Sequence, residues 1–323
     1  MLFRSGPGQN YLQTNGIPQG SILSTLMCNL YYGKMEKMKF PAVFQNSGRH
    51  LGNFNNNGVV SNTSSTSLSS TTPARNSVMV RLVDDYLLET RDKDVATNFV
   101  RTMHHGIPEF SCSVKSCKTK INFDCDLKAN DFNRIEEGGD LAWCGLLINT
   151  DSGEITGDYS KYQNVKMQHV VTNVYTGVEL SKKTRAFLKP KCHALLFDSD
   201  LNGMDIVRIN AFHMYLIAAI KFHTLVKRLP QQPNSNPAFF LHVINDACKY
   251  GKWLIYDRCK KFNTKSSMRE DEIVFIGLYA FFYVLKRKQC RYMGVIDKLK
   301  QRVFFYQRRC VSDADIEFER VDE

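Results

Sequence analysis

The amino-acid sequence predicts an α+β fold, in which an antiparallel sheet with helices on one face is followed by an all-α domain. Apolar residues alternate on both sides of Asp84 and Asp85, a pattern typical of two strands joined by a tight turn. Further short apolar segments, separated by turn residues, continue to about residue 148. Beyond about residue 158 the apolar residues recur at helical spacing, most clearly along 205–228.

The first element of interest is a glycine-containing loop that leads into a helix. Gly16, Pro18 and Gly20 form a tight turn in which the backbone can approach a ligand closely. Ser21 can cap the helix that the apolar spacing predicts over about 22–38. Such a loop is often an ordinary connection before a core helix, but a helix N-terminus is also a favourable place for a phosphate or a base pair.

The next segment, residues 41–77, has a different composition. It is rich in Asn over 53–57 and consists almost entirely of Ser, Thr and Asn over 62–72. A segment of this kind buries too little apolar surface to offset the chain entropy lost on folding. We therefore predict a disordered surface insertion whose two flanks still pack together, because closing a longer loop adds little entropic cost.

Asp84 and Asp85 stand at the tip of the predicted hairpin. Two neighbouring carboxylates repel each other unless a cation neutralises them. Mg²⁺ is the natural partner, since it is bound by one or two carboxylates together with substrate phosphates. An Asp-Asp pair in an arbitrary sequence is most often an exposed acidic turn, so the surrounding motifs have to decide between these interpretations.

Several shorter elements follow the pair. A helix capped by Asp92 or Asp94 is predicted to end near Gly106. Two short strands over 111–114 and 120–123 are predicted on either side of a turn that contains Lys118, and a polar loop covers 124–139. An apolar strand over 141–148 contains Trp143, Cys144 and Gly145, and a turn follows at 151–153.

The second half of the chain is helical and basic. Helices are predicted at 205–228, 236–260, 270–287 and 293–307. The chain carries a net charge of +11 and has a pI of about 9.1. Such a charge favours polyanionic partners, nucleic acid above all, although clusters of basic residues are often only solvated faces.

Composition also argues against several classes of protein. The ten cysteines form no CxxC pair, so a zinc site of the usual spacing is not expected. No secretory signal is visible, and we find no apolar run long enough to span a bilayer. Scattered thiols without a signal sequence point to a reducing intracellular compartment.

The order of these motifs resembles the second half of a polymerase palm followed by its thumb, and more narrowly the telomerase reverse transcriptase family. The segments that carry the resemblance are 16–26 (GIPQGSILSTL, motif B′), 81–88 (RLVDDYLL, motif C), 114–123 (VKSCKTKINF, motif D), 143–147 (WCGLL, motif E) and, in the thumb, 189–193, 229–230 and 236–241. Leu82 favours this family, because most other reverse transcriptases have an aromatic residue there. The resemblance implies palm segments at 1–40 and 78–148, separated by the 41–77 insertion, and a helical thumb at 149–323.

The resemblance also implies roles for individual residues. Asp84 and Asp85 would bind two Mg²⁺ ions, and Lys118 would assist the leaving pyrophosphate, although it could equally be a plain surface lysine. The residues that would contact the nucleotide and the template are Gln19, Gly20, Ser21, Leu82 and Val83. The residues that would hold the primer are Trp143, Cys144, Gly145 and Leu146. Trp143 could instead be a core residue that anchors the sheet to the thumb.

A telomerase reverse transcriptase implies particular partners. These are a telomerase RNA template, a telomeric single-stranded DNA primer, deoxynucleoside triphosphates and telomere-associated proteins. The expected location is the telomeres of chromosomes in the nucleus, and no membrane partner is expected. The family's third carboxylate comes from a strand that precedes motif B′, and it is not found before Gly16. We therefore expect these residues to be an inactive portion of the polymerase when alone.

Two alternatives remain open at this point. One is a mobile-element reverse transcriptase, which an integrase, endonuclease or RNase H domain in the same transcript would favour. The other is a truncated, non-catalytic form that binds nucleic acid through its thumb. The residues encoded upstream of Met1 would separate a full polymerase from this form.

Overall fold

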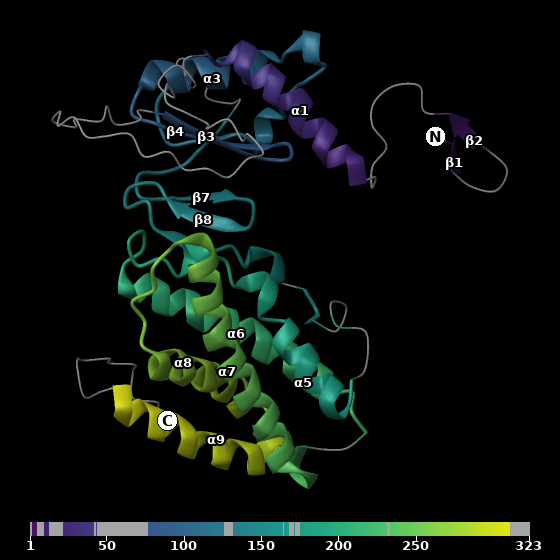
Figure 1. The fold of residues 1–323 in the computed structure, drawn as a ribbon, viewed down its shortest axis with the longest axis vertical. Helices are drawn as coiled ribbons and strands as arrows, with labels where there is room; N and C mark the ends of the chain where they lie inside the picture. The colour runs from purple at the N-terminus through teal and green to yellow at the C-terminus, as the bar shows by residue number, and fades with distance from the viewer. Residues whose placement is uncertain are drawn as a thin grey trace, which may run out of the picture. The chain divides into compact units, whose positions relative to one another are not determined.

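The computed structural model describes residues 2–4, 10–12, 22–41, 43, 77–125, 132–163, 165–167, 171, 175–230 and 233–310. They belong to two compact units, Met1–Glu136 and Glu137–Glu323, and each is described by itself (Figure 1). The predicted site residues Gln19, Gly20 and Ser21 lie outside the described residues, as does most of the predicted insertion. A small antiparallel pair, β1 (Leu2–Arg4) and β2 (Asn10–Leu12), belongs to the first unit.

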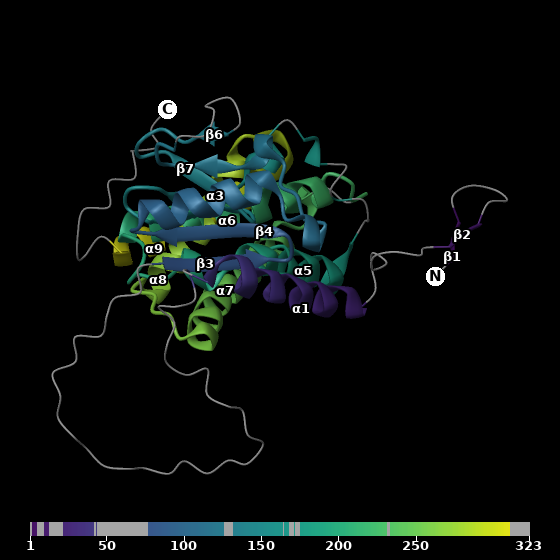
Figure 2. The ribbon, with the colours of Figure 1, turned by 90° about the horizontal axis from the view of Figure 1, so that it is seen from above.

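The first unit is built on a hairpin with two helices on one face. Strand β3 (Ser77–Leu82) pairs antiparallel with β4 (Asp85–Thr90), and α1 (Ile22–Lys39) and α3 (Lys93–His105) lie over them (Figures 1 and 2). Inward-facing strand residues pack against a helical cluster that includes Met35. This confirms the predicted arrangement, but the alternating Val78, Val80 and Leu82 are on the exposed side.

Helix α3 begins and ends where the sequence predicts. The Asp92 carboxylate accepts hydrogen bonds from the backbone N–H groups of Asp94 (2.9 Å) and Val95 (3.2 Å), which fixes the first turn. Gly106 ends the helix with φ of 82°, a conformation that costs glycine little.

The predicted strand at 111–114 is wrong. Cys112 makes only an isolated bridge to Ile107, because the short helix η1 (Pro108–Phe110) and the left-handed Ser111 (φ 46°) turn the chain. The strand predicted at 120–123 is reduced to β5 (Lys120–Ile121). It pairs parallel with β6 (Asn133–Arg134), inside the segment expected to be a loop.

The second unit combines a three-stranded antiparallel sheet with packed helices. The sheet consists of β7 (Asp140–Trp143), β8 (Leu146–Asn149) and β9 (Ile155–Gly157), in that order. The helices are α5 (Gly177–Ala186), α6 (Met204–Val226), α7 (Pro237–Phe262), α8 (Glu270–Lys286) and α9 (Gln289–Cys310). The four predicted helices correspond to α6–α9, whereas α5 was not predicted.

Helix α6 is the centre of this unit and is nearly apolar all round. Its 23 residues are long and apolar enough to cross a bilayer by length and composition, which the sequence analysis did not anticipate. In the structure 67% of its most apolar stretch is buried among the other helices. A helix that is hydrophobic on every face is expected at the centre of a core of this kind.

Tyr215 of α6 is enclosed by two glycines on neighbouring helices. Its hydroxyl donates a hydrogen bond to the backbone carbonyl of Cys248 (3.0 Å). Gly251 of α7 and Gly277 of α8 lie against its ring, and a Cβ atom at Gly277 would meet Cys248 Sγ at 2.9 Å and Tyr215 Cε1 at 3.1 Å. Glycine is therefore required here by close helix packing.

We expect Gly277→Ala to destabilise the helical unit by about 1–3 kcal/mol, because the added methyl group overpacks a well-filled core. Gly33→Ala in α1 is the matched control, since a Cβ atom there has nothing within 4 Å. Alanine is favoured over glycine in a helix by up to about 1 kcal/mol, so the control should be neutral or stabilising. Urea unfolding measures both effects, and equal stability of Gly277→Ala and the parent protein would contradict the packing argument.

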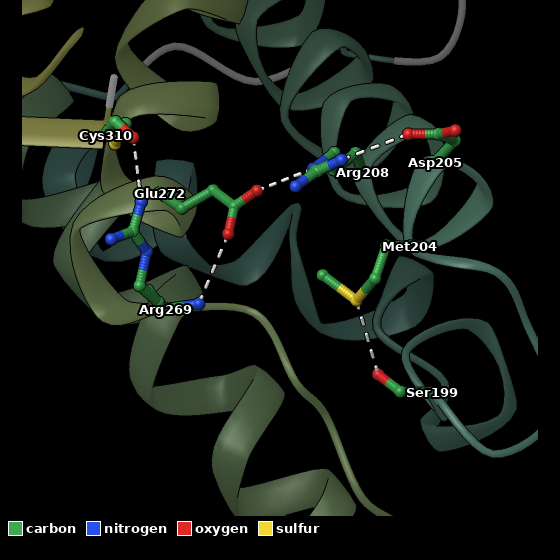
Figure 3. Close-up of polar contacts among 7 residues, drawn as sticks. All are labelled: Ser199, Met204, Asp205, Arg208, Arg269, Glu272 and Cys310. Carbon is green, nitrogen blue, oxygen red and sulfur yellow. Dashed lines mark hydrogen bonds and ion pairs between the residues drawn. The ribbon is translucent and has the colours of Figure 1, made fainter. Parts of the chain in front are cut away.

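A buried carboxylate connects three segments of the helical unit. Glu272 of α8 is 3% exposed and accepts a hydrogen bond from Arg208 Nε of α6 at 2.7 Å (Figure 3). It also accepts from the backbone N–H of Arg269 at 3.3 Å, while the Arg269 guanidinium donates to the carbonyl of Cys310 at 2.9 Å. The arrangement ties the start of α8 to α6 and to the end of α9.

All ten cysteines are free thiols, and their exposure differs between the units. The buried thiols are all in the helical unit: Cys192, Cys248, Cys259 and Cys310. Burial is the main cause that raises the pKa of Cys192, to about 12. It also raises the pKa of Cys248, so both thiols are protonated at neutral pH.

Candidate active site and nucleic-acid surface

The Asp-Asp pair lies at the tip of the predicted hairpin, but only Asp84 is in its two-residue loop. Val83 and Asp84 form the loop between β3 and β4, and Asp85 is the first residue of β4, opposite Leu82. All four side chains are exposed. The turn therefore presents two carboxylates beside the apolar surface of Leu82 and Val83.

Val83 adopts an unusual backbone conformation at this turn. Its φ of 59° is in the left-handed region, which a β-branched residue rarely enters. Two-residue hairpin loops need positive φ at the first position and usually place glycine, asparagine or aspartate there. Strain of this kind costs about 1–3 kcal/mol and persists only where neighbouring contacts hold the chain.

Arg81 supplies such contacts. Its guanidinium forms an ion pair with Glu36 of α1, and both side chains are nearly buried, at 11% and 12% exposure. One terminal nitrogen of Arg81 donates to the Val83 carbonyl at 2.8 Å and to Asn29 Oδ1 at 2.9 Å. The guanidinium also lies 5.3 Å from the Tyr32 ring centroid, so helix α1 encloses it.

The sequence analysis did not find this arginine as a functional residue, because the apolar alternation of Val78, Val80 and Leu82 predicts the opposite face of β3 to be buried. Arg81 is in phase with Met79 and out of phase with Val80 and Leu82, so strand alternation puts it on the face that meets the helices. A charge on an inward face needs a buried partner. Glu36 is that partner, 45 positions earlier in the chain.

The donor set of the turn fits a magnesium ion. Asp84 and Asp85 offer carboxylate oxygens, the ligand type that Mg²⁺ prefers, and their exposure leaves room for substrate phosphates. Within the part of the chain that the structure describes, no group of three or more His, Cys, Asp or Glu side chains is arranged to bind a metal. The fit therefore rests on the two aspartates.

Lys118 also belongs to the first unit. It is exposed at the end of the short helix η2 (Ser116–Lys118), where its backbone N–H donates to the Lys115 carbonyl at 2.9 Å. The turn was predicted between two strands, but only β5 is present beside it.

The Trp-Cys-Gly segment forms a second hairpin and not the single strand predicted over 141–148. Trp143 pairs with Leu146, and Cys144 (φ 50°) and Gly145 (φ 84°) form the loop between them. Two successive residues with positive φ reverse the chain in the way that two-residue hairpins favour. Leu146 packs against the helical core, and the buried indole N–H of Trp143 meets no acceptor among the described residues.

A cluster of lysines and aromatic rings lies in the same unit. Lys191 Nζ is 5.0 Å from the ring centroid of Tyr159 and 4.9 Å from that of Tyr162. Lys221 Nζ of α6 is 5.3 Å from the rings of both Tyr162 and Phe187, and this lysine is only 8% exposed. We call this group the lysine–aromatic cluster.

The ammonium groups of this cluster repel one another. Burial is the main cause that lowers the pKa of Lys191 to about 8, with Lys161 and Lys221 adding to the effect and Asp158 opposing it. Burial also lowers the pKa of Lys221, and the charges that act on it are those of Lys161 and Lys183. Positive charges gathered with little opposing charge favour an anion such as a phosphate group.

Comparisons with known proteins agree on one family. The model of "Telomerase reverse transcriptase, C-terminal extension" matches residues 178–300. The chain is similar to telomerase reverse transcriptase of Bos taurus, with 32% identity over 310 residues that cover 91% of this chain and 24% of the relative. It is 31% identical to the Arabidopsis thaliana protein over 304 residues, which cover 90% of this chain and 26% of that protein. The chain thus spans only about a quarter of these relatives.

A solved structure has the same fold. Telomerase from Candida albicans, in complex with the TWJ fragment of telomeric RNA, superimposes with a TM-score of 0.52. The match covers 91% of this chain and 36% of that one, at 16% sequence identity. At this identity the likeness concerns the fold alone.

Proposed function

Because the chain belongs to the telomerase reverse transcriptase family, as a C-terminal part of it, we propose that it supplies the metal-binding turn and the primer contacts of an RNA-directed DNA polymerase that adds telomeric repeats to chromosome ends. The observation that supports this most directly is the exposure of Asp84 and Asp85 at the tip of the β3–β4 hairpin, where Arg81 donates a hydrogen bond to the Val83 carbonyl.

Each side chain has a role in the proposed reaction. Asp84 and Asp85 would hold two Mg²⁺ ions, which would supply electrostatic stabilisation for nucleotide transfer to the primer end. Lys118 offers a proton or a positive charge to the departing pyrophosphate. Leu82 and Val83 place apolar surface beside the primer end.

Two further segments act on the primer and the template. The hairpin of Trp143, Cys144, Gly145 and Leu146 grips the primer, and the loop of Gln19, Gly20 and Ser21 contacts the nucleotide and the template. The two aspartates supply only part of the carboxylate set that we propose for the site, so these 323 residues alone are expected to extend no primer.

The proposed partners follow from the family and from the charge. They are a telomerase RNA, a telomeric single-stranded DNA primer, deoxynucleoside triphosphates and telomere-associated proteins, met at telomeres in the nucleus. The structural neighbour from Candida albicans is itself a complex with telomeric RNA, which supports an RNA partner here. The lysine–aromatic cluster offers a place for the phosphates of the primer–template duplex.

The direct test is primer extension by the complete protein assembled with its RNA. We expect products that grow by the repeat that the RNA encodes, and we expect ribonuclease treatment before the reaction to abolish them. Extension on any supplied RNA template, without repeat periodicity, would favour a mobile-element enzyme. Duplex binding without extension would favour a non-catalytic form.

The lysine–aromatic cluster leads to a prediction about pH. Lys191 has a pKa of about 8 and must be protonated to bind a phosphate, so duplex affinity of the complete protein should fall as pH rises from 7 to 9. Burial beside Tyr159 and Tyr162 is the main cause of this lowered pKa, to which Lys161 and Lys221 add and which Asp158 opposes. In Lys191→Met this fall should largely disappear, and the salt dependence of binding should weaken by about one phosphate contact.

Lys252→Met is the matched control for this measurement. Lys252 is on α7 and already forms an ion pair with Glu270 at 2.6 Å, so its loss should leave the pH profile unchanged. Fluorescence anisotropy with a labelled RNA–DNA duplex measures both variants. A pH profile of Lys191→Met identical to that of the parent protein would show that the cluster does not contact the duplex.

A further inference from the structure

Arg81 connects two segments that the proposed function uses separately. It is on β3, three residues before Asp84, and its side chain turns away from the exposed face toward α1. Its contacts on α1 are the Glu36 carboxylate and Asn29, the latter through the Oδ1 atom at 2.9 Å and the backbone carbonyl at 3.4 Å. Helix α1 begins at Ile22, immediately after the loop assigned to nucleotide and template contacts.

The same guanidinium also fixes the turn itself. Its hydrogen bond to the Val83 carbonyl, at 2.8 Å, holds the peptide group that joins Val83 to Asp84. This is the peptide group next to the strained φ of Val83, which would relax if nothing held it. The position of the two carboxylates therefore depends on a side chain that lies on the opposite face of the strand.

Packing by Tyr32 and Tyr86 makes Arg81 rigid. The guanidinium lies 5.3 Å from one ring centroid and 5.9 Å from the other, and the Tyr86 hydroxyl donates to Glu36 Oε1 at 3.1 Å. Arginine presents several donors in a planar fork, so it can reach Glu36, Asn29 and the turn at the same time. A lysine at this position would keep the charge but would lose the fork.

We propose that Arg81 is a positioning residue for the metal-binding turn, which couples helix α1 to Asp84 and Asp85 through the Val83 carbonyl. The inference rests on the proposed function, since it takes the two aspartates to be metal ligands. Groups that orient metal ligands typically change metal affinity or activity by 10- to 100-fold when they are replaced. The stability of the fold does not by itself require an arginine here. Replacing a buried ion pair with apolar residues of similar volume often leaves the free energy of unfolding unchanged or raises it.

The test measures metal binding and catalysis separately in the complete protein with its RNA. Mn²⁺ is the probe, and its binding is followed by electron paramagnetic resonance, with Asp84→Asn identifying the site that depends on the aspartates. In Arg81→Lys we expect about tenfold weaker Mn²⁺ binding at that site. We also expect a lower kcat and a higher Mg²⁺ requirement for primer extension, with little change in the KM for nucleotide.

Matched variants separate positioning from general damage. Arg101→Lys makes the same substitution at an exposed arginine of α3 and should leave Mn²⁺ affinity unchanged. Asn29→Ala keeps the ion pair between Arg81 and Glu36 but removes the hydrogen bond from Arg81 to Asn29 Oδ1, and it should weaken Mn²⁺ binding by a smaller factor. If Arg81→Lys fails to fold, Asn29→Ala decides the matter by the same measurement.

Mn²⁺ affinity equal to that of the parent protein, in a folded Arg81→Lys, would overturn the inference. So would the absence of any Mn²⁺ site that depends on Asp84. A parent protein that binds Mn²⁺ at this site but extends no primer would overturn the proposed polymerase function, while the comparison of affinities would still test Arg81. The two failures are therefore distinguishable.

Discussion

Asp84→Ala in the complete protein is expected to reduce primer extension by about a thousandfold or more, while folding and RNA binding stay close to normal. The substitution removes a proposed metal ligand, and stabilising the charge of a transferring phosphoryl group is worth several kcal/mol, with each 1.4 kcal/mol corresponding to about tenfold in rate. The fold should be unaffected because Asp84 is an exposed turn residue outside the apolar cluster of its unit.

The measurement is a repeat-addition assay with the template RNA, accompanied by a thermal melt and an RNA-binding titration. Asp94→Ala is a suitable control, because it removes an exposed carboxylate from the first turn of α3 in the same unit. The control should extend primers at nearly the parent rate. Retained extension by Asp84→Ala would refute the metal assignment.

Glu272→Ala is expected to destabilise the helical unit by about 3–5 kcal/mol, the largest effect on stability that we predict. The substitution removes the buried partner of Arg208, which keeps only its ion pair with the exposed Asp205 (3.1 Å), and it removes the acceptor for the Arg269 backbone N–H (Figure 3). For a unit of this size the melting temperature should fall by roughly 6–20 °C.

Two variants show whether the loss comes from an uncompensated charge. Glu270→Ala removes an exposed carboxylate of the same helix turn, whose partner is Lys252, and should cost less than about 1 kcal/mol. The double variant Arg208→Met with Glu272→Met removes both charges and should be more stable than Glu272→Ala. Equal melting temperatures for Glu272→Ala and Glu270→Ala would show that the contacts of Glu272 drawn in Figure 3 do not stabilise the helical unit.

The sequence predicted elements well where one local signal dominates. The apolar spacing predicted the ends of α1 and α6–α9 to within a few residues. The cap at Asp92 predicted the start of α3. The hairpin at Cys144 and Gly145 was missed because cysteine is not a usual turn residue, so the apolar run looked continuous. The strand at 111–114 failed because Ser111 takes a left-handed conformation that its residue type does not indicate.

The site was predictable only in the part that is contiguous in sequence. Leu82, Val83, Asp84 and Asp85 occupy one turn, as the pattern indicates. The ion pair between Arg81 and Glu36 spans 45 positions, and the lysine–aromatic cluster gathers side chains from Tyr159 at one end to Lys221 at the other. Such long-range pairings depend on how the helices dock, and spacing along the chain carries no information about that.

The contrast between buried and exposed thiols makes local opening of the helical unit measurable by cysteine alkylation. A thiolate reacts with an alkylating reagent and a protonated, buried thiol does not, so Cys192 and Cys248 should become reactive only when the helical unit opens. Cys144 and Cys290 are exposed in the same unit and should react at once. Mass spectrometry of the alkylated peptides would then compare the alkylation rate of the two buried thiols with that of the two exposed ones. Their ratio reports how often the core opens, and no engineered label is needed.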